Sequence, residues 1–133
     1  MRRLFADTFY LLALFNPRDA AHPRAVASSS LPQRRFVTTD WVLTEVADAL
    51  SDSTNRAACV AFLDDVRRSP LVDVIPATRE LFEKGWTLYA ARPDKDWSLT
   101  DCISFTVMQD RGISEALTGD HHFEQAGFTA LLR

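Results

Sequence analysis

The sequence predicts an α/β fold, a three-layer α/β/α sandwich with a central, mainly parallel sheet. Short apolar runs typical of buried strands, the first at 4–6, alternate with longer segments whose apolar residues recur at helical spacing. Parallel strands need crossover connections, which the helical segments can provide. Asp7 directly follows the first apolar run, and Asp120 lies in the turn after the fourth apolar run. Because ligands of such sheets bind beyond the carboxyl ends of the strands, both acids are expected in one crevice.

The individual elements follow from local apolar patterns and from helix start and stop signals. We expect strands at 4–6, 36–39, 71–75, 115–118 and 128–132. We expect helices at 9–14, 22–30, 40–51, 56–68, 78–91 and 98–108, and a helical turn at 121–125. Asp40 is the predicted N-cap of its helix, while Ser98 or Thr100 opens the helix that ends before Gly112.

Length and composition indicate one globular domain covering residues 1–133. The chain is 47% hydrophobic and has no low-complexity tract, which excludes a disordered tail. Its net charge is −3, and all of its 15 basic residues are arginines except Lys84 and Lys95. Arginine binds phosphate in a bidentate manner, so nucleic acid remains a possible partner, although composition alone does not identify one.

Cysteine usage and the absence of a long apolar run favour a cytoplasmic protein with no membrane association. Cys59 and Cys102 lie in apolar helical stretches without CxxC spacing, which argues against a zinc site or a disulfide framework. The acidic interruption at Asp7 leaves no apolar run long enough for a signal peptide. We therefore expect two buried thiols in a reducing compartment.

Four acids are candidate functional residues, but each also has an ordinary explanation. Asp7 and Asp120 follow predicted strands, where acids often form turns or cap helices. Asp101 lies in the first turn of a helix, where the helix dipole favours a carboxylate. Glu45 lies at the edge of an apolar helix stripe, where a solvated side chain is the default. Taken singly, none of the four identifies a site.

The segments around these acids are more specific than the acids alone. They are Phe5-Ala6-Asp7-Thr8, Thr44-Glu45-Val46-Ala47-Asp48-Ala49-Leu50, Trp97-Ser98-Leu99-Thr100-Asp101-Cys102-Ile103-Ser104-Phe105 and Leu117-Thr118-Gly119-Asp120-His121-His122-Phe123. In this order and spacing they resemble the PIN-domain family, and within it the VapC-like toxins of type II toxin–antitoxin systems, along the whole chain. The resemblance implies that four catalytic, metal-binding carboxylates converge on one site: Asp7, Glu45, Asp101 and Asp120.

Hard carboxylate oxygens select Mg²⁺, with Mn²⁺ as an alternative, and such a metal can activate water for attack on phosphorus without a nucleophilic side chain. The resemblance implies an endoribonuclease that leaves a 5′-phosphate and a 3′-hydroxyl. It also implies three partners: an RNA substrate, an inhibitory antitoxin with a basic side chain for the acids, and a second copy of the chain, for which the apolar helices near each end offer a surface.

Several neighbours of the acids are secondary candidates. Hydroxyls at Thr8, Ser98 and Thr100 could orient a carboxylate, and Asp96 could be an outer member of the acidic pocket.

The aromatic and histidine residues near the acids are ambiguous. His121 and His122 cannot both face the acids from one helical turn, and a packing or solvated role is favoured for them. Trp41 and Trp97 could stack on bases, but packing is the better expectation.

Three other functions are compatible with a small α/β fold that carries aspartates at its strand ends. A phosphoryl-receiver domain would need an acidic pair after an early strand and a lysine near the C-terminus, yet no lysine follows Lys95. A haloacid-dehalogenase-like phosphatase would need a second aspartate where Phe9 stands. The serious alternative is a catalytically silent PIN fold that serves as an RNA-binding or interaction scaffold.

Overall fold

A single five-stranded sheet runs through the computed structural model, which describes residues 1–133. Its strands lie in the order β3-β2-β1-β4-β5, and all four pairs are parallel. The bounds are β1 Arg2–Ala6, β2 Arg34–Thr39, β3 Val72–Ile75, β4 Glu115–Leu117 and β5 Thr129–Ala130. The predicted α/β class is therefore confirmed. The last strand is shorter than the predicted 128–132, because only two residues keep regular pairing with β4.

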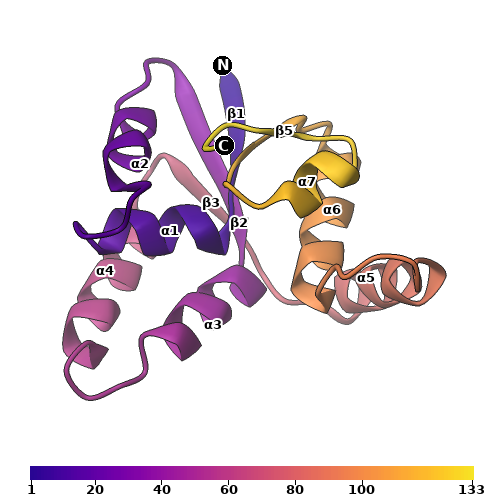
Figure 1. Cartoon of the computed structure of the whole chain (residues 1–133), viewed down its shortest axis with the longest axis horizontal. Helices are drawn as coiled ribbons and strands as arrows, with labels where there is room; N and C mark the ends of the chain where they lie inside the picture. Colours follow the sequence, from indigo (N-terminus) through magenta and orange to yellow (C-terminus); the bar gives the residue numbers. More distant parts are fainter.

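Helices cover both faces of this sheet. Their bounds are α1 Thr8–Phe15, α2 His22–Ser29, α3 Asp40–Ala49, α4 Arg56–Arg68, α5 Arg79–Ala91, α6 Leu99–Arg111 and α7 His121–Gln125. Figure 1 shows α1 to α4 on one side of the strands and α5 to α7 on the other, which gives the three layers. None of these helices is long and apolar enough to cross a membrane.

The start of α3 differs from the prediction. Thr39, not Asp40, is its N-cap, because the Thr39 side chain accepts a hydrogen bond from the Val42 amide. The Asp40 carboxylate instead accepts one from the Ala77 amide, 2.9 Å away and beyond β3. A residue distant in sequence therefore draws Asp40 away from the capping role that its position suggested.

The core is centred on β1 and α6. Leu4 and Phe5 of β1 have no exposed surface, and every residue of α6 from Asp101 to Met108 is buried. Helix α5 packs closely against α6 at Gly85, where an added Cβ would lie 2.3 Å from Ile103 Cγ1. Both cysteines are buried free thiols, as expected. The helix that carries Asp101 is thus fixed on all sides.

A second close contact joins α1 to the loop after β4. The tip of the Phe9 ring occupies the space beside Gly119, where an added Cβ would lie 2.5 Å from Phe9 Cζ. Gly119 does not have a positive φ, so its backbone conformation is open to alanine. The constraint on this position is therefore the ring and not the backbone.

We predict that Gly119→Ala destabilises the protein by about 1–3 kcal/mol, because the methyl group overpacks against Phe9. In a Phe9→Ala background the same change should cost less than about 0.5 kcal/mol, since the ring is gone. Urea unfolding of the four proteins measures both values. An equal cost in the two backgrounds would show that something other than the ring constrains Gly119.

Candidate active site

Pairing of β1 with β4 brings two of the predicted acids together. Ala6 pairs with Leu117, so Asp7 and the loop after β4 leave the sheet side by side. The fully buried Thr118 connects them, because its Oγ1 donates to Asp7 Oδ2 over 2.8 Å and accepts from the Asp120 amide over 3.0 Å. Thr118 therefore fixes Asp7 relative to Asp120.

Asp101 reaches the same place from the N-terminus of α6. Ser98 is the N-cap, and its Oγ accepts from the Asp101 amide over 3.0 Å. In return, Asp101 Oδ2 accepts from the Ser98 amide over 3.3 Å. This capping box is a stability feature of the helix, and it also fixes the direction of the carboxylate.

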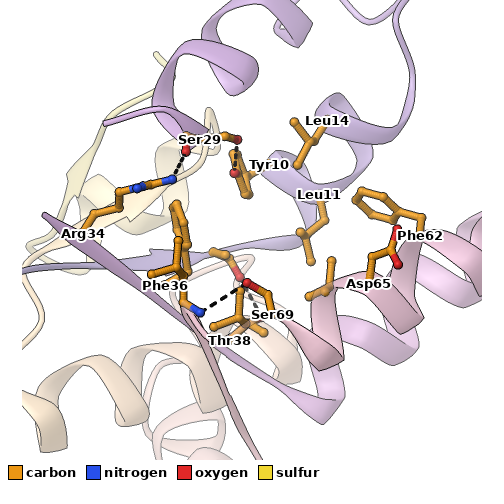
Figure 2. Close-up of a pocket in the computed structure, with 14 residues that line it drawn as sticks. Tyr10, Leu11, Leu14, Ser29, Arg34, Phe36, Thr38, Phe62, Asp65 and Ser69 are labelled. Atoms are coloured by element: carbon orange, nitrogen blue, oxygen red, sulfur yellow. Dashed lines mark hydrogen bonds between the residues drawn. The ribbon is translucent and has the colours of Figure 1, made fainter. Parts of the chain in front are cut away.

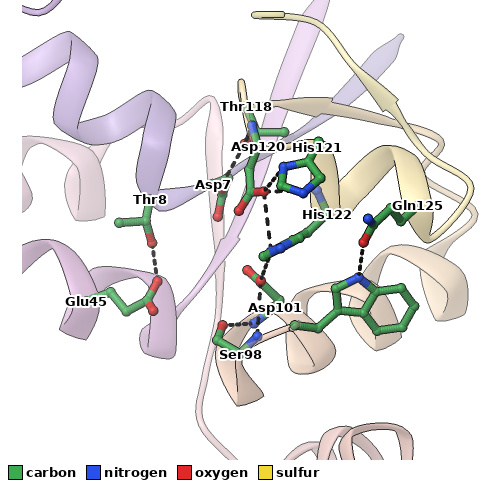
Figure 3. A network of polar contacts seen from close by, with 11 residues as sticks. Asp7, Thr8, Glu45, Ser98, Asp101, Thr118, Asp120, His121, His122 and Gln125 are labelled. Carbon is green, nitrogen blue, oxygen red and sulfur yellow. Dashed lines mark hydrogen bonds and ion pairs between the residues drawn. The ribbon is translucent and has the colours of Figure 1, made fainter. Parts of the chain in front are cut away.

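His122 links Asp101 to Asp120. Its Nδ1 lies 3.2 Å from Asp101 Oδ2 and 3.4 Å from Asp120 Oδ1 (Figure 3). His121, by contrast, is exposed, with its Nδ1 3.7 Å from Asp120 Oδ1. One potential metal-binding atom from each of Asp120, His121 and His122 lies within 4.8 Å of the other two. The sequence-based preference for a packing or solvated role was wrong for His122, which faces the acids.

Glu45 stands at the side of this network. It is half-buried on α3, and its Oε1 accepts from Thr8 Oγ1 over 2.5 Å (Figure 3). No hydrogen bond joins it to the other three acids. Thr8 directly follows Asp7, so this single bond ties α3 to the end of β1.

The remaining candidates lie outside these contacts. Thr100 is half-buried and its side chain makes no hydrogen bond. Asp96 is exposed in a depression that Trp86, Trp97 and Ser98 line. Trp97 is 6% exposed and its Nε1 donates to Gln125 over 3.0 Å, which agrees with the packing role expected of it.

Sequence reasoning missed two contributors, Thr118 and His122. Both belong to the segment 117–123 around Asp120, but the predicted site was built on acidic residues and did not include them. A hydroxyl at a strand end, directly before a glycine–aspartate turn, was the available signal for Thr118. The contact of His122 with Asp101 joins residues 21 apart, and no local pattern indicates it.

Burial of these carboxylates changes their acidity. Burial raises the pKa of Asp7 to about 7, which the Thr118 hydrogen bond partly offsets and the charges of Asp101 and Asp120 increase. Burial, and then the charge of Asp120, also raises the pKa of Asp101, against hydrogen bonds from Ser98 and His122. Both acids are therefore less stable as anions here than in water.

These donors suit a hard divalent cation. Carboxylate oxygens are the ligands that Mg²⁺ and Mn²⁺ prefer, and mutual repulsion of the acids is relieved by a positive charge among them. Asp7, Asp101 and Asp120 are the candidate ligands for such an ion, with Glu45 at the side, although only Asp120, with His121 and His122, belongs to a group of metal-binding atoms within 4.8 Å of one another.

An apolar hollow lies elsewhere and contains none of these acids. It has a volume of about 350 Å³ and lies between α1, α4 and strands β2 and β3 (Figure 2). Leu11, Phe36 and Phe62 line it, together with the hydroxyl of Tyr10, which is 2.5 Å from Ser29 Oγ. We place the candidate active site at the acids, because the hollow has no convergent catalytic groups.

Comparison with known proteins shows the family of the chain. The PIN domain family model matches residues 4–129. The 23S rRNA-specific endonuclease VapC20 of Mycobacterium tuberculosis is 32% identical over 125 residues, which cover 94% of this chain and 95% of that protein.

Solved structures show the same architecture. The crystal structure of Mycobacterium tuberculosis VapC20, described as a sarcin-ricin loop cleaving toxin, superposes with a TM-score of 0.83 over 95% of this chain and 96% of its own, at 32% identity. Rickettsia felis VapBC2, bound to a promoter DNA fragment, has a TM-score of 0.70 at 11% identity and covers 96% of both chains. Neisseria gonorrhoeae FitAcB has a TM-score of 0.64 at 14% identity and covers 96% and 94%. These last two share the fold alone. The chain therefore belongs to the PIN-domain family and, within it, is related to the VapC toxins.

Proposed function

We propose that this protein is a Mg²⁺-dependent endoribonuclease, with Mn²⁺ as a possible substitute, and the toxin of a toxin–antitoxin pair. The observation that supports this most is the meeting of Asp7, Asp101 and Asp120 at the carboxyl ends of β1 and β4. Three acids from distant parts of the chain share one network there, two of them buried. RNA-cleaving relatives of the same length support the choice of substrate class.

The chain's own residues divide the work. Asp7, Asp101 and Asp120 hold the cation, and Thr118 and the Ser98 cap keep two of these carboxylates in place. Thr8 holds Glu45 beside them. When bound, the cation would activate a water molecule and neutralise charge on the attacked phosphate. No serine or cysteine nucleophile is required.

A catalytically silent scaffold with the same fold is the competing function. It would gain nothing from burying Asp7 and Asp101 near a third acid, which raises their pKa values and destabilises the fold. The presence of such a cluster favours the catalytic function over the silent scaffold, because groups that lower stability persist mainly where function needs them.

The antitoxin we propose would neutralise the same cluster with a basic side chain. An arginine or lysine placed among buried carboxylates forms charge-assisted hydrogen bonds and competes with the cation. Native mass determination of the complex after co-expression with the neighbouring gene product tests for such a partner. A complex that forms equally well with Asp101→Asn and Asp120→Asn variants would argue against insertion of a basic group among these acids.

We also propose a homodimer. Helix α6 buries most of its apolar residues in the protein's own core, whereas α1 leaves Leu12, Leu14 and Phe15 only partly buried. Two exposed aromatic side chains lie together on α5, where Trp86 is 48% and Tyr89 is 44% exposed and their rings stack 5.7 Å apart. This pair is the surface that a second copy would cover.

Light scattering should report a dimer at tens of micromolar, and Trp86→Ser with Tyr89→Ser should convert it to monomer without loss of helical content. Val60→Ser, which changes an equally exposed side chain on α4, is the matched control and should remain dimeric. A monomeric wild-type protein would refute the dimer. A dimer that survives the double change would place the interface elsewhere.

Cleavage tests the proposed activity directly. Asp101→Asn should lower RNA cleavage in millimolar Mg²⁺ at least a hundredfold, because it removes a charged ligand from the cation that carries the chemistry. Chelator should abolish cleavage by the wild type. Asp48→Asn, the same change at an exposed position on α3, should retain activity. Near-normal cleavage by a purified Asp101→Asn protein would remove this residue from the mechanism.

The raised pKa of Asp7 predicts how stability depends on pH and on metal. The folded state binds this proton more tightly than the unfolded chain, so its contribution to stability is complete below about pH 4 and is lost as pH rises through about 7. In chelator at pH 8, Asp7→Asn should therefore be more stable than wild type by about 1–3 kcal/mol, or roughly 3 °C or more in Tm.

At pH 5 the gain should be smaller than at pH 8, since Asp7 is then protonated in the folded state and ionised only in the unfolded chain. Millimolar Mg²⁺ at pH 8 should shrink or reverse the gain, because only the wild type keeps all of its ligands. Melting curves under the three conditions measure this. A variant less stable than wild type by the same amount in all of them would show that Asp7 does not belong to a repulsive metal-binding cluster.

A further inference from the structure

Phe9 is an exposed aromatic residue at the edge of the acidic cluster. Its side chain is 36% exposed on the first turn of α1, two residues after Asp7. Both neighbours are engaged, because Thr8 donates to Glu45 and Tyr10 is buried against the core. The other exposed large apolar side chains within elements lie on α2, α4 and α5. Phe9 is the one that packs on the turn carrying Asp120.

The ring is held in place and does not simply project into solvent. Its tip packs against Gly119, the residue between Thr118 and Asp120, so closely that a Cβ there would meet Cζ, Cε1 and Cε2 within 2.9 Å. Thr118 and Asp120 in turn are fixed to each other and to Asp7. The ring therefore packs on the turn that presents Asp120.

A fixed, partly exposed ring beside a phosphate-processing site has a specific use. Phenylalanine has no donor or acceptor, so it binds neither phosphate nor the hydrogen-bonding edge of a base. It can bind the flat face of a base, which is available only where the nucleotide is unpaired and unstacked. A phosphate held over Asp7 and Asp120 carries nucleosides on both sides, one of which lies on the Phe9 side of the cluster.

We propose that Phe9 is a base-stacking residue that positions the unpaired nucleotide adjoining the cleaved phosphate. This rests on the proposed ribonuclease function and deepens it. It gives the site a contact with RNA that does not depend on the identity of the base. Gly119 takes part by leaving room for the ring, so the turn that presents Asp120 also locates the stacking surface.

The test titrates protein into a short single-stranded RNA that carries the fluorescent base 2-aminopurine. The buffer contains Ca²⁺ in place of Mg²⁺, because Ca²⁺ is a second hard, oxygen-binding cation. Stacking on wild-type protein should quench the fluorescence. Phe9→Leu should bind about tenfold more weakly with the quenching lost, and Phe9→Trp should retain both. Phe15→Leu makes the same change at the far end of α1 and is the matched control.

A second measurement separates stacking from a purely structural effect. An abasic nucleotide replaces 2-aminopurine next to the cleaved bond, and a terminal dye reports the affinity. This replacement should weaken binding by the wild type about tenfold, as Phe9→Leu does, and should leave the affinity of Phe9→Leu unchanged. In Mg²⁺, Phe9→Leu should raise KM about tenfold with kcat within threefold.

The outcomes distinguish this inference from the function on which it rests. If wild type cleaves RNA and Phe9→Leu shows the same affinity and quenching, the stacking role is wrong while the ribonuclease stands. If Phe9→Leu loses affinity equally for the normal and the abasic RNA, the ring acts on the fold and stacking is again refuted. If wild type neither binds nor cleaves RNA, both proposals fail together.

Discussion

The pairing of β1 with β4 is the interaction on which the rest of the site depends. These two strands are separated by more than a hundred residues, yet Ala6 pairs with Leu117 at the centre of the sheet. Because the strands are parallel, the residues that follow them emerge at the same edge. Thr118 then converts this neighbourhood into a fixed geometry through its two hydrogen bonds. Strand order therefore sets which acids can meet before any side chain contributes.

The site also shows how this fold keeps acids together without a positive charge of its own. No arginine or lysine forms an ion pair with Asp7, Asp101 or Asp120, although the chain has 15 such residues. The groups that face these carboxylates are a hydroxyl, backbone amides and the imidazole of His122. Such hydrogen-bond donors orient the acids without occupying the place of a cation. An arginine paired with the same acids would compete with a cation for them.

Much of this arrangement could be predicted from the sequence, and the failures have physical causes. The apolar runs and helical spacing gave strands and helices close to those observed, because local periodicity reports which face is buried. The N-cap of α3 was misassigned since Asp40 bonds to Ala77, a contact made only in the folded chain. The facing of His122 toward Asp101 was missed for the same reason. Periodicity could not relate the four acids to one another, and the motif resemblance supplied that relation.

The separation of Asp7 and Thr118 along the chain has a consequence for synthesis. The hydrogen bond between them spans 111 residues, so it can form only once both segments have left the ribosome. The backbone bond from the Leu132 amide to the Thr118 carbonyl adds a contact from still further along the chain. A nascent chain therefore lacks the assembled cluster until Thr118 and Asp120 have been synthesised. For the proposed ribonuclease, this order of assembly leaves each growing copy without its acids in place while the preceding part of its messenger is being read.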